Sequence, residues 1–492
     1  MSSGVAPLEA MRAALAKLKA DPSVRYAEVR FVDDVTERLK IRDLRVDRAT
    51  SSNARGVAIR VLGTKTWGFS CTSDVSEDAV MRAADRAVAI AKASASVVTS
   101  PVLFPERAGE TGTFQTPVEI DPFSISIEKK LAELEKAVSA LRSGAPASIR
   151  TAEAWMDWTR LRKHLLTTEG TDVSQDLTYG GCGMHVYAVG GDGRAQRRSY
   201  PTWQGGDGFQ AGYEKVGALD LAGHANETRD EALALLTAPA CPNATRDLIL
   251  ESSQMALQIH ESCGHPTELD RALGTEISLA GGSFMQPNLL GSLRYGSREV
   301  DLVADATSPG GMGTFGWDDE GTRAGKHALV RDGMFVDYLS SRESAAALGR
   351  ASTGTMRADG WNRTPIIRMT NVSLEPKRGS LDDLIADTKD GVYFATDKSW
   401  SIDDLRLNFQ FSCEIAWEIK NGKRMRILRD PFYTGITPEF WRSCDAVCGP
   451  EEWKLWGVQN CGKGDPMQIM QVGHGAAPAR FKGVSSGSSG QA

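Results

Sequence analysis

A nine-residue stretch, Gln258–Pro266, restricts the fold and chemistry of this chain more than any other part of its sequence. It places Glu261 directly after His260 and brings a second imidazole, His265, five residues after the first. Neutral imidazole is a good ligand for Zn²⁺, and two imidazoles on one local element can chelate the ion. A metal ion lowers the pKa of bound water to roughly 7, and a neighbouring glutamate can accept the proton. The stretch therefore predicts a metal site that carries its own general base.

The spacing of the two histidines is unusual for a helical metal site. On a straight α-helix, residues i and i+5 lie about 140° apart, so a regular helix would point the two imidazoles in different directions. Gly264 can adopt a positive φ, and Pro266 disfavours the α region for His265. We therefore expect a helix over residues 245–263 that ends or kinks at Gly264, so that His265 turns back toward the ion. The competing interpretation is that His260 is a hydrogen-bonded core histidine and that the match is accidental.

Two histidines make a weak site, so a third ligand must come from another part of the chain, and thiolate is a strong ligand for zinc. Cys461 is followed by glycine, which leaves its sulfur exposed, and nearby Lys463 would lower its pKa. Cys444 and Cys448 have the spacing of a metal-binding pair but lack a second pair. Cys413 alternates with apolar residues on an expected strand, which is typical of a small core residue.

Composition excludes several classes of protein. The 492 residues are enough for two or three domains, and the net charge of −6 comes without a basic cluster of the kind that binds nucleic acid. No run of about 20 apolar residues indicates a membrane span, and the N-terminus does not resemble a secretory signal. The eight cysteines are too sparse for a disulfide framework and are typical of reduced thiols. We expect a cytoplasmic protein without a membrane or nucleic-acid partner.

The order of periodic segments predicts an α+β fold in three parts. Residues 1–240 are expected to form an antiparallel α/β domain, 241–481 a mostly β domain that carries the metal-binding helix, and 482–492 a disordered Gly/Ser-rich tail. Proline and asparagine near residue 240 mark the boundary. The expected helices of the first part are 8–19, 76–92, 126–141 and 227–236, and its first expected strands are 25–32, 36–43, 56–62 and 66–71.

Four sequence blocks of the second half resemble one known family. They are His260–His265 (HESCGH), Trp317–Thr322 (WDDEGT), Asn460–Gly464 (NCGKG) and Val472–Gly475 (VGHG), in this order along the chain. Together they resemble the TldD/TldE (PmbA) family of metallopeptidases. The first half is similar to the family only in its general pattern of helices and strands.

The resemblance implies a ligand set and a mechanism. It assigns His260, His265 and Cys461 as ligands of a zinc ion and Glu261 as the catalytic base. Because the chain keeps all of these residues, it is similar to the active, TldD-type subunit of the family and not to the subunit that lacks the motif. The implied substrates are unfolded or extended peptides, held as an added strand beside a sheet edge. The implied assembly is a dimer, either of like chains or with a metal-less homologous subunit, around a chamber to which the first domain contributes.

Two further predictions concern polar residues in the matched blocks. His474 stands where some family members have an aliphatic residue, so it is expected to act as a proton donor or oxyanion partner, unless it is a solvated histidine of a glycine-rich loop. Asp319 and Glu320, together with Asp318, are expected to bind the amino terminus of the substrate or to orient a ligand histidine, unless they form a plain acidic turn. No organic cofactor is expected.

Two other functions remain open from the sequence. A zinc amidase that acts on a small molecule would use the same residues. A non-catalytic subunit with a structural metal would also keep them, but a structural zinc site is closed by four protein ligands, whereas a catalytic site keeps an open position.

Overall fold

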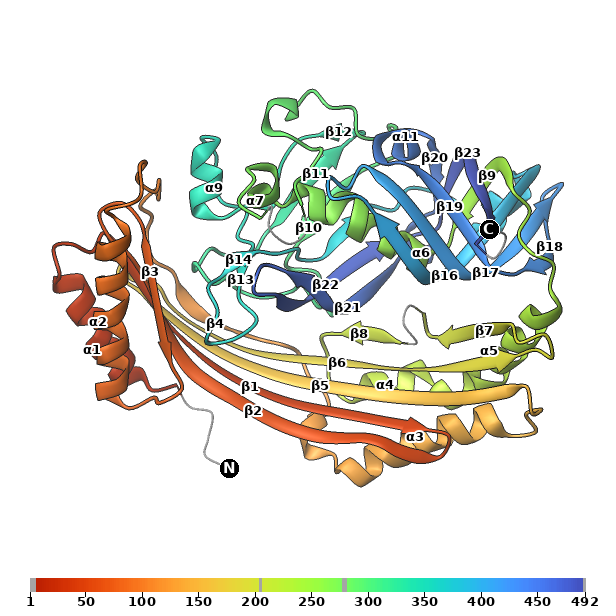
Figure 1. The fold of residues 1–492 in the computed structure, drawn as a ribbon, viewed down its shortest axis with the longest axis horizontal. Coiled ribbons are helices and arrows are strands. Elements are labelled where there is room, and N and C mark those ends of the chain that lie inside the picture. The colour runs from red at the N-terminus through yellow and green to blue at the C-terminus, as the bar shows by residue number, and fades with distance from the viewer. Residues whose placement is uncertain (1–5, 203–205, 277–280, 490–492) are drawn as a thin grey trace.

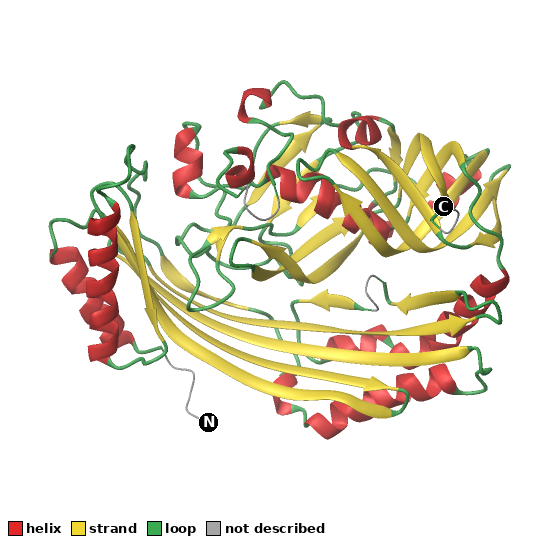
Figure 2. Ribbon diagram, viewed as in Figure 1, coloured by secondary structure: helices red, strands yellow, loops and turns green. Residues whose placement is uncertain are grey.

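The computed structural model describes residues 6–202, 206–276 and 281–489, which form two layers (Figure 1). A long curved sheet from the first half lies below a compact body from the second half, and helices cover the lower face and one end of the sheet. Figure 2 shows that strands predominate in both layers. The predicted α+β class is therefore confirmed. No helix within the described residues is long and apolar enough to cross a membrane.

The lower layer is built on four antiparallel strands of 17 to 19 residues, β1 (Tyr26–Arg42), β2 (Arg45–Leu62), β5 (Ile149–Thr167) and β6 (Asp172–Val189). Each would span about 60 Å at roughly 3.4 Å per residue. The shorter strands of this layer are β3 (Trp67–Thr72), β4 (Thr111–Gln115), β7 (Ala195–Tyr200) and β8 (Asp207–Phe209). The two short strands expected before residue 45 are one continuous strand, β1, because its neighbours β2 and β5 pair with it along nearly its whole length.

Helices bury the apolar faces of this sheet. The helices α1 (Leu8–Ala20) and α2 (Glu77–Ser94) pack on one end, where their alanine-rich faces meet valines of β1 and β2. The helices α3 (Ile127–Arg142) and α5 (Leu221–Thr237) lie beneath β5 and β6. Two short elements, η1 (Pro122–Ser124) and α4 (Glu214–Leu219), complete this layer.

The upper body contains a ring of five strands. The pairing order β16–β9–β23–β19–β17 is closed by a further pairing between β16 and β17, and β18 and β20 extend it. The bounds are β9 (Ala244–Leu250), β16 (Asp390–Ile402), β17 (Asn408–Lys420), β18 (Lys423–Leu428), β19 (Pro431–Ile436), β20 (Cys444–Val447) and β23 (Ala479–Ser488).

Smaller elements surround this ring. A four-stranded sheet has the order β12–β11–β10–β15, and β13 pairs with β14. The strands are β10 (Leu302–Asp305), β11 (Lys326–Arg331), β12 (Met334–Phe335), β13 (Met356–Arg357), β14 (Ile366–Ile367) and β15 (Val372–Leu374). The helices are α6 (Ser252–Ile259), α7 (Leu269–Ala272), α9 (Arg342–Ala347), α10 (Leu381–Ala386), α11 (Thr437–Arg442), η5 (Pro287–Leu289) and η6 (Pro450–Glu452).

The hairpin of β21 (Lys454–Lys463) and β22 (Gln468–Ala476) connects the two layers. It continues the long sheet through β8, to which β21 is joined at the pair Gly457 and Gly208. A Cβ atom on Gly457 would lie 2.0 Å from the carbonyl oxygen of Gly208, so only glycine allows this approach. The hairpin carries Cys461 on β21, next to His265 of the upper body.

Two expectations about the second half are wrong. Residues 244–250, expected to begin a helix, form β9, because the apolar run Leu248–Leu250 pairs with β16 on one side and with β23 on the other. Residues 482–488, expected to belong to a disordered tail, lie in β23, where their backbone pairs with β9 and β19 despite the Gly/Ser-rich composition. Residues 490–492 lie outside the described part of the chain.

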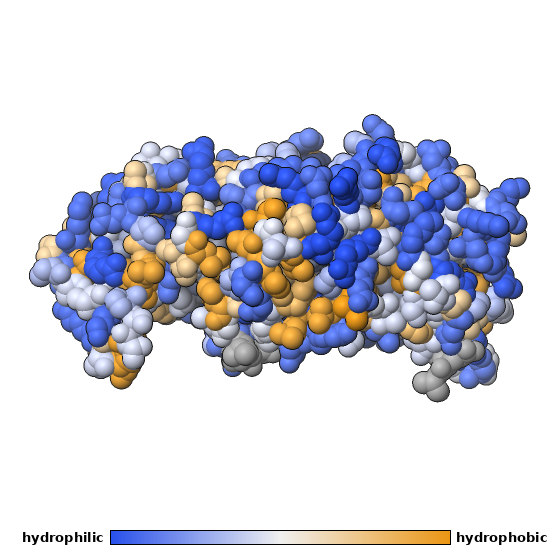
Figure 3. All heavy atoms as spheres, turned by 90° about the horizontal axis from the view of Figure 1, so that it is seen from above, coloured by the Kyte–Doolittle hydropathy of each residue, from blue (hydrophilic) through white to orange (hydrophobic). Residues whose placement is uncertain are grey.

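The face of the molecule seen from above the upper body is not uniformly polar. Apolar side chains gather over its middle, and hydrophilic side chains lie toward both ends (Figure 3). The exposed large apolar residues of the second half include Leu273, Trp400, Leu405 and Ile436.

Candidate metal centre

The helix that carries the two histidines changes its winding at the motif. The α-helix α6 is completely buried and continues as a π-helix, η3 (His260–Gly264), followed by a 3-10 turn, η4 (His265–Thr267). The backbone N–H of His265 donates to the carbonyl of His260, which is the i to i+5 hydrogen bond of a π-helix. This wide turn puts residues five apart on one face. The two imidazole rings accordingly lie 4.8 Å apart between centroids.

The expected kink at Gly264 does not occur. Gly264 has a φ of −55° and His265 a φ of −63°, so both stay in the helical region. A Cβ atom at this position would lie 2.1 Å from the sulfur of Met369, so any other residue would require the methionine side chain to move. The prediction that His265 turns toward His260 is thus met by a widened helix and not by a break.

Cys461 reaches the two histidines from strand β21. The register of β21 against β22 shifts between Val458 and Cys461, which is a β-bulge close to the site. One ligand atom from each of His260, His265 and Cys461 lies within 4.8 Å of the others, and the Cys461 sulfur is 3.8 Å from Nε2 of His265. Zinc–nitrogen and zinc–sulfur bonds of about 2.0–2.3 Å put neighbouring ligand atoms roughly 3.5 Å apart, so this donor set fits a zinc ion.

The ring of His260 is oriented by His474. Nδ1 of His474 lies 2.9 Å from the carbonyl oxygen of Val372, which can only accept a hydrogen bond, so this nitrogen carries a proton. Nε2 of His474 is then the acceptor for Nδ1–H of His260, at 2.7 Å. His260 therefore carries its lone pair on Nε2, the nitrogen that a metal requires.

This arrangement corrects the role predicted for His474. The residue is fully buried, and both of its ring nitrogens are engaged in hydrogen bonds within the protein. Burial, together with the neighbouring His260, keeps its pKa well below the usual value, so the ring is neutral. His474 is neither a proton donor in an open pocket nor a solvated loop histidine. It is a positioning residue for His260.

The ring of His265 is oriented in the same way by a carboxylate. Nδ1 of His265 lies 2.9 Å from Oε2 of Glu268, which also accepts a hydrogen bond from Nε of Arg271 at 2.9 Å. The Glu268 carboxylate is fully buried, yet Lys463 and the other nearby cations hold its pKa well below the usual value. Glu268 was not singled out from the sequence, although its position three residues after His265 allows this contact.

The surroundings of the three donors favour the protonation states that a metal needs. Burial lowers the pKa of both His260 and His265 to about 4, so both rings are neutral at neutral pH. Burial raises the pKa of Cys461, but Arg368 and His265 outweigh this effect and bring the pKa below the ordinary thiol value. The prediction that Lys463 activates an exposed Cys461 is wrong, because Cys461 is buried and the Lys463 ammonium is fully buried against Asp270.

Glu261 faces the same pocket as the three donors. A pocket of about 240 Å³ is lined by His260, Glu261, His265, Cys461, Arg406 and Trp400, among others. One carboxylate oxygen of Glu261, Oε2, accepts a hydrogen bond from Nη1 of Arg406 at 2.6 Å. The pocket thus joins the predicted ligands, the predicted base and an arginine that no sequence motif singles out.

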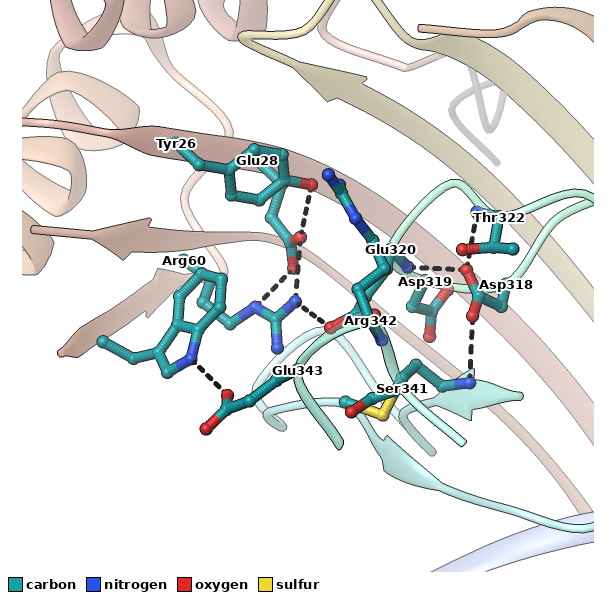
Figure 4. A network of polar contacts seen from close by, with 12 residues as sticks. Tyr26, Glu28, Arg60, Asp318, Asp319, Glu320, Thr322, Ser341, Arg342 and Glu343 are labelled. Carbon is teal, nitrogen blue, oxygen red and sulfur yellow. Dashed lines mark hydrogen bonds and ion pairs between the residues drawn. The ribbon is translucent and has the colours of Figure 1, made fainter. Parts of the chain in front are cut away.

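The acidic turn at residues 318–320 does not belong to this pocket. Asp319 forms ion pairs with Arg30 at 2.6 Å and with Lys163, both on strands of the long sheet. Glu320 pairs with Arg60 of β2 at 3.0 Å. Figure 4 shows the turn with Glu320 next to Arg60.

Asp318 completes this network by accepting hydrogen bonds from backbone N–H groups, including that of Thr322. All three acidic side chains are at most 2% exposed. The prediction that Asp319 and Glu320 bind substrate is wrong in this structure, because their carboxylates tie the upper body to the sheet.

Sequence comparisons place the chain in a family. Three family models match successive parts of the chain, namely PmbA/TldA metallopeptidase domain 1 over residues 27–91, the central domain over 120–236 and the C-terminal domain over 243–487. The chain belongs to this family. The resemblance seen in the four sequence blocks is therefore confirmed.

Named relatives of this PmbA/TldA family member cover nearly its whole length. A metalloprotease of Methanocaldococcus jannaschii is 28% identical over 92% of this chain and 95% of its own length. A metalloprotease TldD homologue of Haemophilus influenzae is 24% identical over 90% and 89%, and a zinc metalloprotease TldD homologue of Saccharolobus solfataricus is 20% identical over 84% and 86%. These names agree with the predicted enzyme class.

Solved structures share the fold. The crystal structure of TldE from Thermococcus kodakarensis superimposes with a TM-score of 0.73 at 16% identity, over 97% of this chain and 99% of that one. A Thermotoga maritima protein gives a TM-score of 0.77 at 16% identity, over 97% and 100%. At such identity the likeness establishes the fold alone.

Proposed function

We propose that this chain is a zinc-dependent peptidase that hydrolyses unfolded or extended peptides. The observation that carries the proposal is the meeting of two imidazoles, one thiol and a glutamate in a single pocket. His260, His265 and Cys461 would hold the ion, and three protein donors leave a position for water or substrate. Among the described residues this group contains no fourth His, Cys, Asp or Glu ligand, which argues against a closed structural site.

Glu261 would act as the general base and then as the acid. Zinc, when bound, supplies a Lewis acid that polarises a peptide carbonyl and lowers the pKa of water. Glu261 accepts a proton from the attacking water as the carbon–oxygen bond forms. It then returns that proton to the leaving nitrogen as the carbon–nitrogen bond breaks, which yields one carboxylic acid and one amine.

A second cavity gives the proposed substrate room. It measures about 380 Å³ and shares Val458 and Asn460 with the metal pocket. It lies between β21 and the long sheet, and charged side chains of both signs line it together with an indole: Arg38, Lys40, Glu153, Asp157, Asp207 and Trp155. Two neighbouring cavities with shared lining residues suit an extended peptide better than the surface of a folded protein.

A dimer belongs to the same proposal. The family resemblance implies an assembly either of like chains or with a metal-less homologous subunit, in which the long sheet would form the wall of a chamber. Light scattering of the purified chain, alone and with such a subunit, distinguishes the two assemblies by mass.

The decisive experiment combines a zinc assay with one substitution. Purified protein is expected to hold about one zinc per chain and to cleave an unstructured peptide, while Glu261→Gln keeps the zinc but loses at least roughly 10³-fold in kcat. Glu135→Gln, on the exposed surface of α3, is the matched control and should retain wild-type activity. Cleavage by Glu261→Gln at the wild-type rate would remove the assigned base, and zinc-loaded protein that cleaves no peptide would refute the proposed function.

A further inference from the structure

One arginine in the metal pocket comes from a hairpin that the sequence blocks do not include. Arg406 lies in the loop between β16 and β17, and its guanidinium reaches the carboxylate of Glu261. Its side chain is 13% exposed and that of Glu261 is 6% exposed. The contact is therefore a partly buried ion pair inside the pocket and not a surface pair.

The loop holds Arg406 in a strained conformation. Its φ of +64° lies in the left-handed region, which residues other than glycine, asparagine and aspartate seldom adopt. Several bonds fix this backbone. The N–H of Arg406 donates to the carbonyl of Asp403 at 2.9 Å, and its own carbonyl accepts from the Thr437 hydroxyl at 2.8 Å. Backbone strain that the surroundings enforce in this way is concentrated at functional sites.

Most of the hydrogen-bonding capacity of Arg406 remains unused. Of its donors, Nη1 bonds Glu261, whereas Nε is buried and has no hydrogen-bond partner within the described residues. Nη2 likewise forms no bond with the described part of the chain. The Nε atoms of several other arginines are also buried without a partner, so what points to a ligand here is the position of Arg406 in the lining of the pocket, next to Glu261. A planar cation with spare donors suits an oxygen that carries negative charge.

We propose that Arg406 is a catalytic residue of the peptidase reaction, with two tasks. It fixes Glu261 through Oε2, which leaves Oε1 to accept the proton of the attacking water. It also donates a hydrogen bond to the oxygen of the scissile carbonyl as that oxygen becomes negative. This inference rests on the proposed function, since it concerns the same pocket and the same reaction.

The formal charges in the pocket agree with this assignment. With a divalent ion, a Cys461 thiolate and a Glu261 carboxylate, the pocket would be neutral without the arginine. Arg406 makes it +1, and this total is unchanged by the attack, because the negative charge moves from the Glu261 carboxylate, which takes the proton of the water, to the carbonyl oxygen. A fixed cation at the place where negative charge develops stabilises the transition state more than the uncharged ground state.

The test separates catalysis from binding and folding. Removal of one oxyanion donor typically lowers kcat roughly 10²–10³-fold, so Arg406→Ala is expected to lose this much with KM changed less than about threefold. Arg406→Lys, which keeps the charge but not the planar donors, should recover part of the loss. Leu405→Ala is the matched control, because Leu405 is an exposed neighbour in the same loop and should retain wild-type kcat.

Two readouts do not depend on turnover. A phosphinic peptide, which imitates the tetrahedral oxyanion, should bind Arg406→Ala at least tenfold more weakly than wild type. The uncleaved peptide should bind Glu261→Gln and the double variant Glu261→Gln/Arg406→Ala with affinities within about threefold. Thermal unfolding and zinc content identify any variant that is misfolded, and in that case Arg406→Lys is compared instead.

Each outcome decides the inference. An Arg406→Ala protein that is folded and zinc-loaded and that keeps its kcat overturns it, as does an unchanged phosphinate affinity. A loss confined to KM overturns it too, because Arg406 would then only bind the ground state. If the wild-type chain cleaves no peptide, the proposed function fails, whereas active wild type with active Arg406→Ala refutes this inference alone.

Discussion

The hydrogen-bonded chain from Val372 through His474 to His260 makes a quantitative prediction about metal affinity. Replacing His474 by leucine removes the acceptor for Nδ1–H of His260 at 2.7 Å and leaves two buried polar groups, that N–H and the Val372 carbonyl, without their partner. Residues that orient a metal-binding histidine typically contribute 10–100-fold to metal affinity, which equals about 1.4–2.7 kcal/mol. We therefore expect His474→Leu to bind zinc 10–100-fold more weakly than wild type.

A second substitution at the same position separates orientation from packing. In His474→Gln the amide oxygen can still accept from His260, so the affinity should lie within about threefold to tenfold of wild type. The assay is competition for zinc against a chelator of known affinity, at one pH and with protein whose folding is checked by circular dichroism. If His474→Leu binds zinc within threefold of wild type, the tautomer of His260 does not depend on His474 and the reasoning is refuted.

Two further predictions concern stability. Burial lowers the pKa of His260 and of His265 from the ordinary 6.5 to about 4, so below pH 6.5 the unfolded chain binds protons that the folded chain does not. Urea unfolding of the metal-free protein should show a stability loss between pH 6.5 and 4 that reaches about 3 kcal/mol per histidine, and His265→Asn should reduce it. Asp319→Asn leaves Arg30 and Lys163 short of a buried partner and should cost about 3–5 kcal/mol of unfolding free energy. The folded variant should keep the KM of the wild type. A raised KM would support the original prediction that Asp319 binds substrate.

Ligand chemistry is a property of residue type, so the sequence was sufficient to select the three candidate ligands of the proposed metal centre. His260, His265 and Cys461 stand out by their side chains, and the structure brings them together although the thiol is almost 200 positions away. The residues that support these ligands could not be selected from the sequence in the same way. Glu268 and Arg368 are ordinary charged residues in the sequence, and only the folded chain shows that they face the ligands.

The errors share a physical origin. Residues 244–250 have an apolar run too short to distinguish a buried strand from a helix, and the pairing with β16 and β23 decides the outcome. The charge of a residue was an equally ambiguous guide to its role. Asp319 in a turn next to a matched motif suggested binding, but its cationic partners come from strands more than 150 residues earlier. In both cases the outcome depended on tertiary contacts, about which the periodicity of the sequence carries no information.

The π-helix at the motif shows how the tertiary fold determines the geometry of the site. A widened turn displaces the ordinary α-helical hydrogen bonds, so its polar groups need other partners. Here the Ser262 carbonyl accepts from the Tyr295 hydroxyl at 2.9 Å, and the Ser262 hydroxyl accepts from the Trp441 indole at 2.8 Å. The Thr267 hydroxyl bonds the carbonyls of Cys263 at 2.8 Å and Gly264 at 3.0 Å.

Tyr295 and Trp441 belong to other parts of the upper body and are fully buried. The spacing of five residues therefore brings the two histidines together only because these buried residues hold the π-helix in place. On an isolated helix the same residues would point about 140° apart, and the metal centre would not form. The local motif supplies the ligands, and the fold of the whole second half supplies the angle at which they meet.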